Sequence, residues 1–168
     1  GPGRCGKTTN LEQIFKAGRK YTQTEMVSIN TKGDRTLFFD FLPMGLGEIK
    51  GFDVRVQVYT VPGQVQYRST LKLVLKGVDG VIFVDDSLAV RREKNMLSLK
   101  DLQHNLKEYG INIFKIPLVM QHNKRDLAEE GLPLSSIEEM EKTFNRQLKA
   151  PSFAASAVNG QGVNDTWK

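Results

Sequence analysis

The sequence opens with Gly1-Pro2-Gly3-Arg4-Cys5-Gly6-Lys7-Thr8, which matches the pattern G-x-x-x-x-G-K-[ST]. Glycines in this pattern let the backbone fold back, so that several N–H groups and the positive end of the following helix face one concavity. Lys7 can then reach the β- and γ-phosphates of a nucleotide, and the Thr8 hydroxyl can bind Mg²⁺. A glycine turn before a helix is the plainer alternative, but apolar residues at helical spacing follow directly, which favours a phosphate-binding loop.

Segments typical of strands and helices alternate along the rest of the chain. We expect strands at residues 26–29, 36–42, 54–59, 80–85, 117–121 and 153–157. We expect helices at residues 7–20, 69–76, 91–109 and 135–148, and from Gly162 onward. This alternation predicts an α/β fold, with a mainly parallel central sheet and flanking helices, in one domain over residues 1–168.

Two local signals refine this outline. Gly45, Gly47 and Gly51 predict a turn after the strand that Pro43 bounds. The segment from Ser135 to Glu138 resembles the capping box that starts a helix.

The two ends of the chain suggest that the domain is truncated. A phosphate loop normally follows a strand, yet Gly1 is the first residue, and the last residues run into a helical pattern. We therefore expect that the first strand and the last helix of the fold are missing from this chain.

Asn123-Lys124-Arg125-Asp126 follows an expected strand and matches N-K-x-D. The Asp126 carboxylate can accept hydrogen bonds from N1–H and the exocyclic amine of guanine, a donor pair that adenine lacks. Asn123 can tie this loop to the phosphate loop, and the Lys124 stem can cover the base. Alone the tetrapeptide is a common polar loop, but more than 100 residues after a phosphate loop it indicates guanine binding. Ser156-Ala157 ends another strand, where a backbone N–H can bind the guanine oxygen.

A third motif, Thr60-Val61-Pro62-Gly63-Gln64, lies where Ras-type GTPases carry D-x-x-G-Q. The order and spacing of the motifs resemble the Ras superfamily of P-loop GTPases. Within it, the strings D-R-T-L-F-F-D-F-L-P at residues 34–43 and T-V-P-G-Q at residues 60–64 resemble the bacterial MglA family, small GTPases of cell polarity and gliding motility. The resemblance covers essentially the whole chain.

The resemblance implies a set of site residues. Catalytic roles fall to Gln64, which orients water, to Arg35 as an arginine finger supplied in cis, and to Lys7. The residues expected to bind GTP or GDP are Gly1, Gly3, Cys5, Gly6, Lys7, Thr8, Thr9, Gly63, Asn123, Lys124, Asp126, Ser156 and Ala157. From its position alone, Arg35 reads more readily as an exposed loop arginine.

The expected Mg²⁺ site departs from the Ras pattern. Thr60 stands where Ras-type proteins carry an aspartate that holds the metal through water, and a hydroxyl carries no charge. We expect Mg²⁺ at Thr8 and Thr36, with Asp40 as the candidate carboxylate; Asp40 as an ordinary strand residue is the alternative.

Composition narrows the function classes. Apolar residues make up 39% and charged residues 26% of the chain, which indicates an ordinary globular protein. No apolar run is long enough to span a membrane. The net charge is +5, and because the basic residues are scattered along the sequence, nucleic acid is not required as a partner. Cys5 is the only cysteine, so no internal disulfide is possible, and a cytoplasmic location is expected.

Three functions fit to different degrees. A GTP-hydrolysing molecular switch is favoured by the G-Q pair at Gly63-Gln64 over a GTP-binding scaffold with negligible hydrolysis. A small-molecule kinase is disfavoured because the N-K-R-D loop reads a base. The family resemblance implies a roadblock-domain GTPase-activating protein, an exchange factor and polarity or motility effectors as partners, and recruitment to the cell pole.

Overall fold

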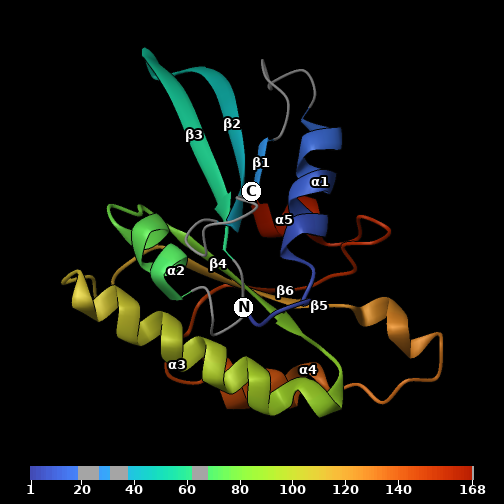
Figure 1. Cartoon of the computed structure of the whole chain (residues 1–168). Helices are drawn as coiled ribbons and strands as arrows, with labels where there is room; N and C mark the ends of the chain where they lie inside the picture. Colours follow the sequence, from blue (N-terminus) through green and yellow to red (C-terminus); the bar gives the residue numbers. More distant parts are fainter. Residues whose placement is uncertain (19–26, 31–37, 62–67, 168) are drawn as a thin grey trace.

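The computed structural model describes residues 1–18, 27–30, 38–61 and 68–167 of the chain (Figure 1). The first of its two three-stranded sheets is antiparallel, in the order β1-β2-β3. Its strands are β1 (Val27–Asn30), β2 (Phe38–Ile49) and β3 (Phe52–Thr60). Along β3 the valines at 54, 56 and 58 are half-buried and the residues between them are exposed, as the alternating sequence predicts.

The hairpin between β2 and β3 corrects the turn predicted from the glycines. β2 runs through Pro43 and past Gly45 and Gly47, and its register against β3 shifts between those two glycines, as at a β-bulge. The turn is the pair Lys50-Gly51, with φ of 52° and 83°, a two-residue connection that matches the twist of the strands. Among the described residues, β1 pairs with β2 from Phe38 to Phe41, so Pro43 has a described partner strand on one side alone, where proline is tolerated.

The second sheet is parallel, as predicted, with the order β4-β5-β6. Its strands are β4 (Val81–Asp86), β5 (Leu118–Asn123) and β6 (Ser152–Ala154). Asp86 is paired with Asn123 in the ladder, so the carboxyl ends of β4 and β5 lie at one edge. Ligands of open α/β sheets bind at this edge, which directs attention to the loops that leave it.

Helices cover both faces of the parallel sheet (Figure 1). The α-helices are α1 (Lys7–Ala17), α2 (Arg68–Leu75), α3 (Arg92–Glu108), α4 (Ile137–Met140) and α5 (Val163–Trp167). The described residues also form the 3₁₀ turns η2 (Ala89–Arg91) and η3 (Arg125–Ala128) and the π-helical turn η4 (Glu141–Asn145). No helix of the described ranges is both long and apolar enough to traverse a bilayer.

Two apolar clusters hold these layers together. Buried Phe83, Leu106 and Met120 join β4, α3 and β5 in the larger one. Leu11 and Leu42 join α1 to β2 in the smaller one. The smaller cluster therefore attaches the antiparallel sheet to the helix that follows the phosphate loop.

The two sheets are separate in the described part of the chain, where no ladder pairs β3 with β4. A cavity of about 1600 Å³ is lined by residues of both strands, among them Val56 and Val58 from β3 and Val81 and Phe83 from β4. The α/β fold and the parallel arrangement of β4, β5 and β6 are confirmed. A strand before Gly1 and a helix after the last residue stay predictions.

The start of α4 lies one residue later than the sequence pattern predicts. The capping box is formed by Ser136 and Glu139: the Glu139 N–H donates to Ser136 Oγ, and the Ser136 N–H donates to Glu139 Oε2. Both frames offer a serine three residues before a glutamate, so the local pattern cannot choose between them. The Ser135 N–H instead donates to the carbonyl of Ser87, which places Ser135 outside the helix.

Candidate functional site

The phosphate loop ends at Gly6, the residue that caps the N-terminus of α1. Gly6 has φ of 97°, and a Cβ there would lie 2.3 Å from Nδ2 of Asn123, so both backbone and space require glycine. Within the described residues no side chain caps α1 and its first turn holds no acidic residue. The first N–H groups of α1 are therefore available to an anion, as the loop motif predicts.

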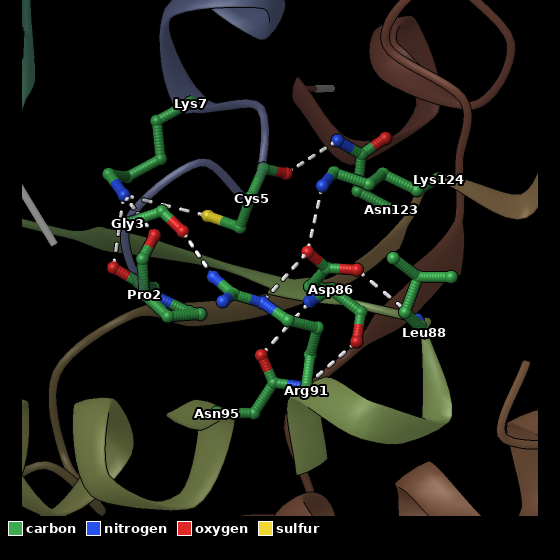
Figure 2. A network of polar contacts seen from close by, with 11 residues as sticks. Pro2, Gly3, Cys5, Lys7, Asp86, Leu88, Arg91, Asn95, Asn123 and Lys124 are labelled. Carbon is green, nitrogen blue, oxygen red and sulfur yellow. Dashed lines mark hydrogen bonds and ion pairs between the residues drawn. The ribbon is translucent and has the colours of Figure 1, made fainter. Parts of the chain in front are cut away.

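Lys7 folds back over this loop. Its ammonium donates to the carbonyls of Gly1 and Pro2 at 3.0 and 2.7 Å and lies 3.5 Å from Sγ of Cys5 (Figure 2). Cys5 is fully buried, whereas Arg4 is exposed and has a left-handed φ of 64°. The Lys7 ammonium therefore places a positive charge at the phosphate loop. Thr9 lies in the first turn of α1.

The candidate metal residues Thr8 and Asp40 lie together. The Thr8 hydroxyl donates to Asp40 Oδ2 at 2.7 Å, and the Thr60 hydroxyl donates to the same oxygen at 2.8 Å. Asp40 is 5% exposed and stands on β2, next to the end of β3. In the described part of the chain no group of three His, Cys, Asp or Glu side chains could hold a metal ion. The oxygen donors at Thr8 and Asp40 nevertheless suit Mg²⁺, which typically takes one or two carboxylates and completes its shell with water and phosphate.

Asn123 joins three segments of the site. Its Nδ2 donates to the carbonyl of Cys5 at 2.8 Å, and its Oδ1 accepts the N–H of Ala157 at 2.9 Å. The side chain is 1% exposed. It ties the phosphate loop, the end of β5 and the loop after β6 to one another, as the sequence predicts for its link to the phosphate loop.

The rest of the N-K-R-D loop turns sharply after Asn123. Lys124 has a left-handed φ of 70°, and its ammonium donates to Asp86 Oδ2 at 2.8 Å. Asp126 lies in η3, and its Oδ1 is buried without a hydrogen-bond partner among the described residues. A buried carboxylate oxygen without a partner is expensive, so this oxygen is suited to a donor on a ligand.

Ser156 and Ala157 are buried beside Asn123, but their backbone donors are occupied. The Ser156 N–H donates to the carbonyl of Gln161, and the Ala157 N–H to Asn123. Ser156 Oγ is buried without a partner in the described ranges. A backbone N–H from this pair to the guanine oxygen stays a prediction, and it requires the Ala157 N–H to exchange its partner.

Four expected site residues lie outside the described residues: Arg35, Thr36, Gly63 and Gln64. The phosphate loop, Asp40 and the N-K-R-D loop are brought together, whereas the catalytic roles of Arg35 and Gln64 rest on sequence alone.

Sequence reasoning missed two polar networks around β4. The carboxylate of Asp86 binds Lys124 and also lies 3.4 Å from Nε of Arg91. On another side of the strand, Asp85 Oδ2 lies 2.8 Å from Nδ1 of His122, whose Nε2 lies 2.8 Å from Glu141 Oε1. The sequence did carry one sign of these networks: two consecutive aspartates stand at the carboxyl end of an apolar strand. Burying a charge there costs free energy unless the charge is paired, so partners for both aspartates could have been expected.

The imidazole ring of His122 lies between two carboxyl groups, those of Asp85 and Glu141. Both ring nitrogens of His122 meet carboxyl groups, and an ionised carboxylate only accepts, so this arrangement favours a ring that carries both protons. Burial opposes that charge, but the bonds and charges of Asp85 and Glu141 outweigh it and raise the pKa of His122. Burial also raises the pKa of Asp85, while the contacts of Glu141 outweigh its partial burial and lower its pKa.

Comparison with known proteins gives concordant matches. The family model described as the ADP-ribosylation factor family matches residues 4–168. The chain is 52% identical over 168 residues to the mutual gliding-motility protein MglA of Myxococcus xanthus (strain DK1622), covering 100% of this chain and 84% of that protein. It is 27% identical over 175 residues to the ADP-ribosylation factor-like protein 3 of Caenorhabditis elegans, covering 99% and 82%.

Proposed function

Because the chain belongs to the ADP-ribosylation factor family of small GTPases, we propose that it is a GTP-dependent switch that controls gliding motility and cell polarity. The resemblance to MglA seen in the sequence is confirmed, and as a family member the chain binds guanine nucleotide and hydrolyses GTP. A scaffold with negligible hydrolysis is not favoured. The motility role rests on the name of the Myxococcus xanthus relative.

One observation carries the assignment of the nucleotide site. Asn123 holds the phosphate loop against the N-K-R-D loop, while Asp126 Oδ1 is buried without a partner in the described residues. A guanine donor pair supplies the missing partner, and the diphosphate lies at the N-terminus of α1. Lys7 then moves its donors from the loop carbonyls of Gly1 and Pro2 to phosphate oxygens.

Thr8 and Asp40 would hold Mg²⁺, together with Thr36. When bound, Mg²⁺ neutralises the charge of the β- and γ-phosphate oxygens. The residues of the chain then divide the remaining work: Thr8 and Asp40 fix the position of the metal site, and Lys7 balances phosphate charge.

The hydrolytic step itself is assigned to Gln64 and Arg35 on the strength of the resemblance. Gln64 orients the attacking water, and Arg35 neutralises the charge that develops on the γ-phosphoryl oxygens. A loop arginine supplied in cis is rarely in place without help, so intrinsic hydrolysis is slow. We propose that a roadblock-domain activating protein holds the loop, that an exchange factor and effectors complete the cycle, and that the protein acts in the cytoplasm at the cell pole.

Single-turnover GTP hydrolysis tests this function. The wild type should hydrolyse GTP slowly and respond to the activating partner. Arg35→Ala and Gln64→Ala should each remove most of the stimulation, since an arginine finger is typically worth about 10³–10⁵ in rate, while GTP affinity stays close to that of the wild type. An Arg35→Ala variant that responds as well as the wild type would show that the arginine comes from elsewhere. A wild type that binds no guanine nucleotide would overturn the function.

A further inference from the structure

Asp86 is the most heavily engaged side chain at the carboxyl edge of the parallel sheet. Its carboxylate is 0% exposed; Oδ2 accepts from Lys124 at 2.8 Å, and Oδ1 accepts the N–H of Leu88 at 3.2 Å. Asn95 of α3 binds both the N–H and the carbonyl of Asp86, at 3.0 and 2.8 Å. Backbone and side chain are therefore fixed together, so the carboxylate is a rigid acceptor.

Arg91 connects this acceptor to the phosphate loop. It ends η2, its side chain is 18% exposed, and its Nε lies 3.4 Å from Asp86 Oδ2. The other end of the same guanidinium donates to the carbonyl of Gly3 (Figure 2). A planar guanidinium can contact two acceptors in a fixed geometry, which a flexible ammonium does not do as well.

The bond to the Gly3 carbonyl has a consequence for the loop. Because the peptide group is planar and trans, its C=O and N–H point in opposite directions. Holding the Gly3 carbonyl on Arg91 therefore aims the N–H of Arg4 away from Arg91. Phosphate loops work by aiming backbone N–H groups at the ligand, so the orientation of this peptide matters for binding.

Arg91 contacts the phosphate loop and Asp86 contacts the N-K-R-D loop. Each of these loops contains a non-glycine residue with a left-handed backbone conformation. These are Arg4, with φ of 64°, and Lys124, with φ of 70°. Such conformations persist where the surroundings hold them, and they concentrate at functional sites. Arg91 is bonded to the peptide that precedes Arg4, and Asp86 is bonded to the side chain of Lys124.

We propose that Arg91 and Asp86 are positioning residues that couple the phosphate loop to the guanine-reading loop, through the chain of contacts from the Gly3 carbonyl to Arg91, Asp86 and Lys124. The coupling rests on the proposed nucleotide site. Asp126 follows Lys124 by two residues, so an anchored Lys124 also fixes where the Asp126 carboxylate meets the base. Loss of Arg91 should therefore weaken both the binding of the phosphates by the phosphate loop and the binding of the base by Asp126.

The first measurement is the rate of release of fluorescent GDP from wild type and Arg91→Ala. We expect release to be roughly tenfold faster in the variant, equivalent to about 1.4 kcal/mol. Arg92→Ala is the matched control: the neighbouring arginine donates to Thr143 Oγ1 at 3.1 Å, an exposed contact away from both loops. It should release GDP at the wild-type rate. Thermal melts show whether each variant is folded, and Arg91→Lys, which keeps the charge but not the fork, replaces Arg91→Ala if the latter is unfolded.

The second measurement separates coupling from simple support of one loop. Inosine diphosphate lacks the exocyclic amine, so the ratio of GDP to inosine diphosphate affinity reports how well Asp126 is placed. We expect Arg91→Ala to lower this ratio at least about threefold, and Arg92→Ala to leave it unchanged. An unchanged release rate, or faster release with the ratio intact, would overturn the coupling while leaving the proposed site standing. A wild type that binds neither nucleotide would overturn the site itself.

Discussion

At the scale of single residues, we expect Asp126 to carry the guanine specificity of the proposed nucleotide site. Its Oδ1 is buried without a partner in the described residues and can only accept while ionised. Asp126→Asn places a donor opposite the donors of guanine, and each mismatched buried hydrogen bond costs about 1–3 kcal/mol. GTP affinity should therefore fall by roughly 10–100-fold, and xanthosine triphosphate, which carries an acceptor carbonyl in place of the exocyclic amine of guanine, should bind better than to wild type.

Competition binding with both nucleotides measures this change. Asp53→Asn is the matched control, because Asp53 is exposed at the start of β3 and is paired only locally with Arg55. Unchanged GTP affinity in Asp126→Asn would show that this carboxylate does not read the base.

Asp40 has a different task, because it accepts from Thr8 and Thr60 at one oxygen. Because Thr60 is uncharged, we propose Asp40 as the carboxylate that supports Mg²⁺ at Thr8. Asp40→Ala should raise the Mg²⁺ concentration needed for nucleotide binding by at least roughly 10-fold, because losing even an outer partner of a metal site typically costs about 10–100-fold in metal affinity. Asp40→Asn keeps an acceptor for Thr8 but not the charge, so its Mg²⁺ requirement should lie between those of the wild type and Asp40→Ala.

A Mg²⁺ titration of GDP binding in the three proteins decides the role of Asp40. Superimposable curves for wild type and Asp40→Ala would discard it and leave Asp40 as a strand residue that fastens β2 to α1.

His122 joins three elements, since it contacts Asp85 on β4 and Glu141 on η4 from its own place on β5. Its pKa is raised in the folded protein despite burial, because both carboxylates favour the charged ring. A raised histidine pKa stabilises fully below the unfolded value of about 6.5, and this stability is lost as pH rises through the folded pKa. The free energy of unfolding should therefore decrease above about pH 6.5, with a slope of up to about 1.4 kcal/mol per pH unit from this group.

Denaturant melts of wild type and His122→Gln between pH 6 and 9 test this slope, which the variant should lack. His104→Gln is the control, because His104 is 71% exposed and its ion-pair partner among the described residues is Glu108, on its own helix, at 3.5 Å. Equal slopes in wild type and His122→Gln would show that His122 does not hold its charge in the fold.

The elements also show how far the sequence alone could go. Local periodicity predicted the cores of the helices and strands. Motif spacing predicted the contact of Asn123 with the phosphate loop, but not its contact with Ala157. Sequence reasoning missed the length of β2, because glycine and proline normally end a strand, whereas here Gly45 and Gly47 lie at a bulge and Pro43 lies inside the ladder with β3. It missed Arg91 and His122, because their partners lie on other elements and no local pattern records tertiary contacts.

At the scale of the molecule, the nucleotide site draws on both sheets. Asp40 comes from the antiparallel sheet, whereas Asn123 and Asp86 end strands of the parallel sheet, and the phosphate loop with α1 lies between them (Figure 1). No ladder joins the two sheets in the described residues, and a cavity of about 1600 Å³ is lined by both. A ligand bound at the proposed site would therefore contact residues of both sheets at once.

Nucleotide should accordingly stabilise the whole domain. A ligand that binds only the folded state at 100 times its Kd adds about 2.7 kcal/mol, and a domain of this size gains roughly 2–4 °C per kcal/mol, so Mg²⁺–GDP should raise the melting temperature by roughly 5–10 °C. ADP at the same concentration should raise it much less, because adenine offers Asp126 no donor pair. Asp126→Asn should lose most of the GDP effect while melting like wild type without nucleotide. Equal shifts with GDP and ADP would mean that the phosphate loop alone holds the ligand and that the guanine loop contributes nothing to the stability of the complex.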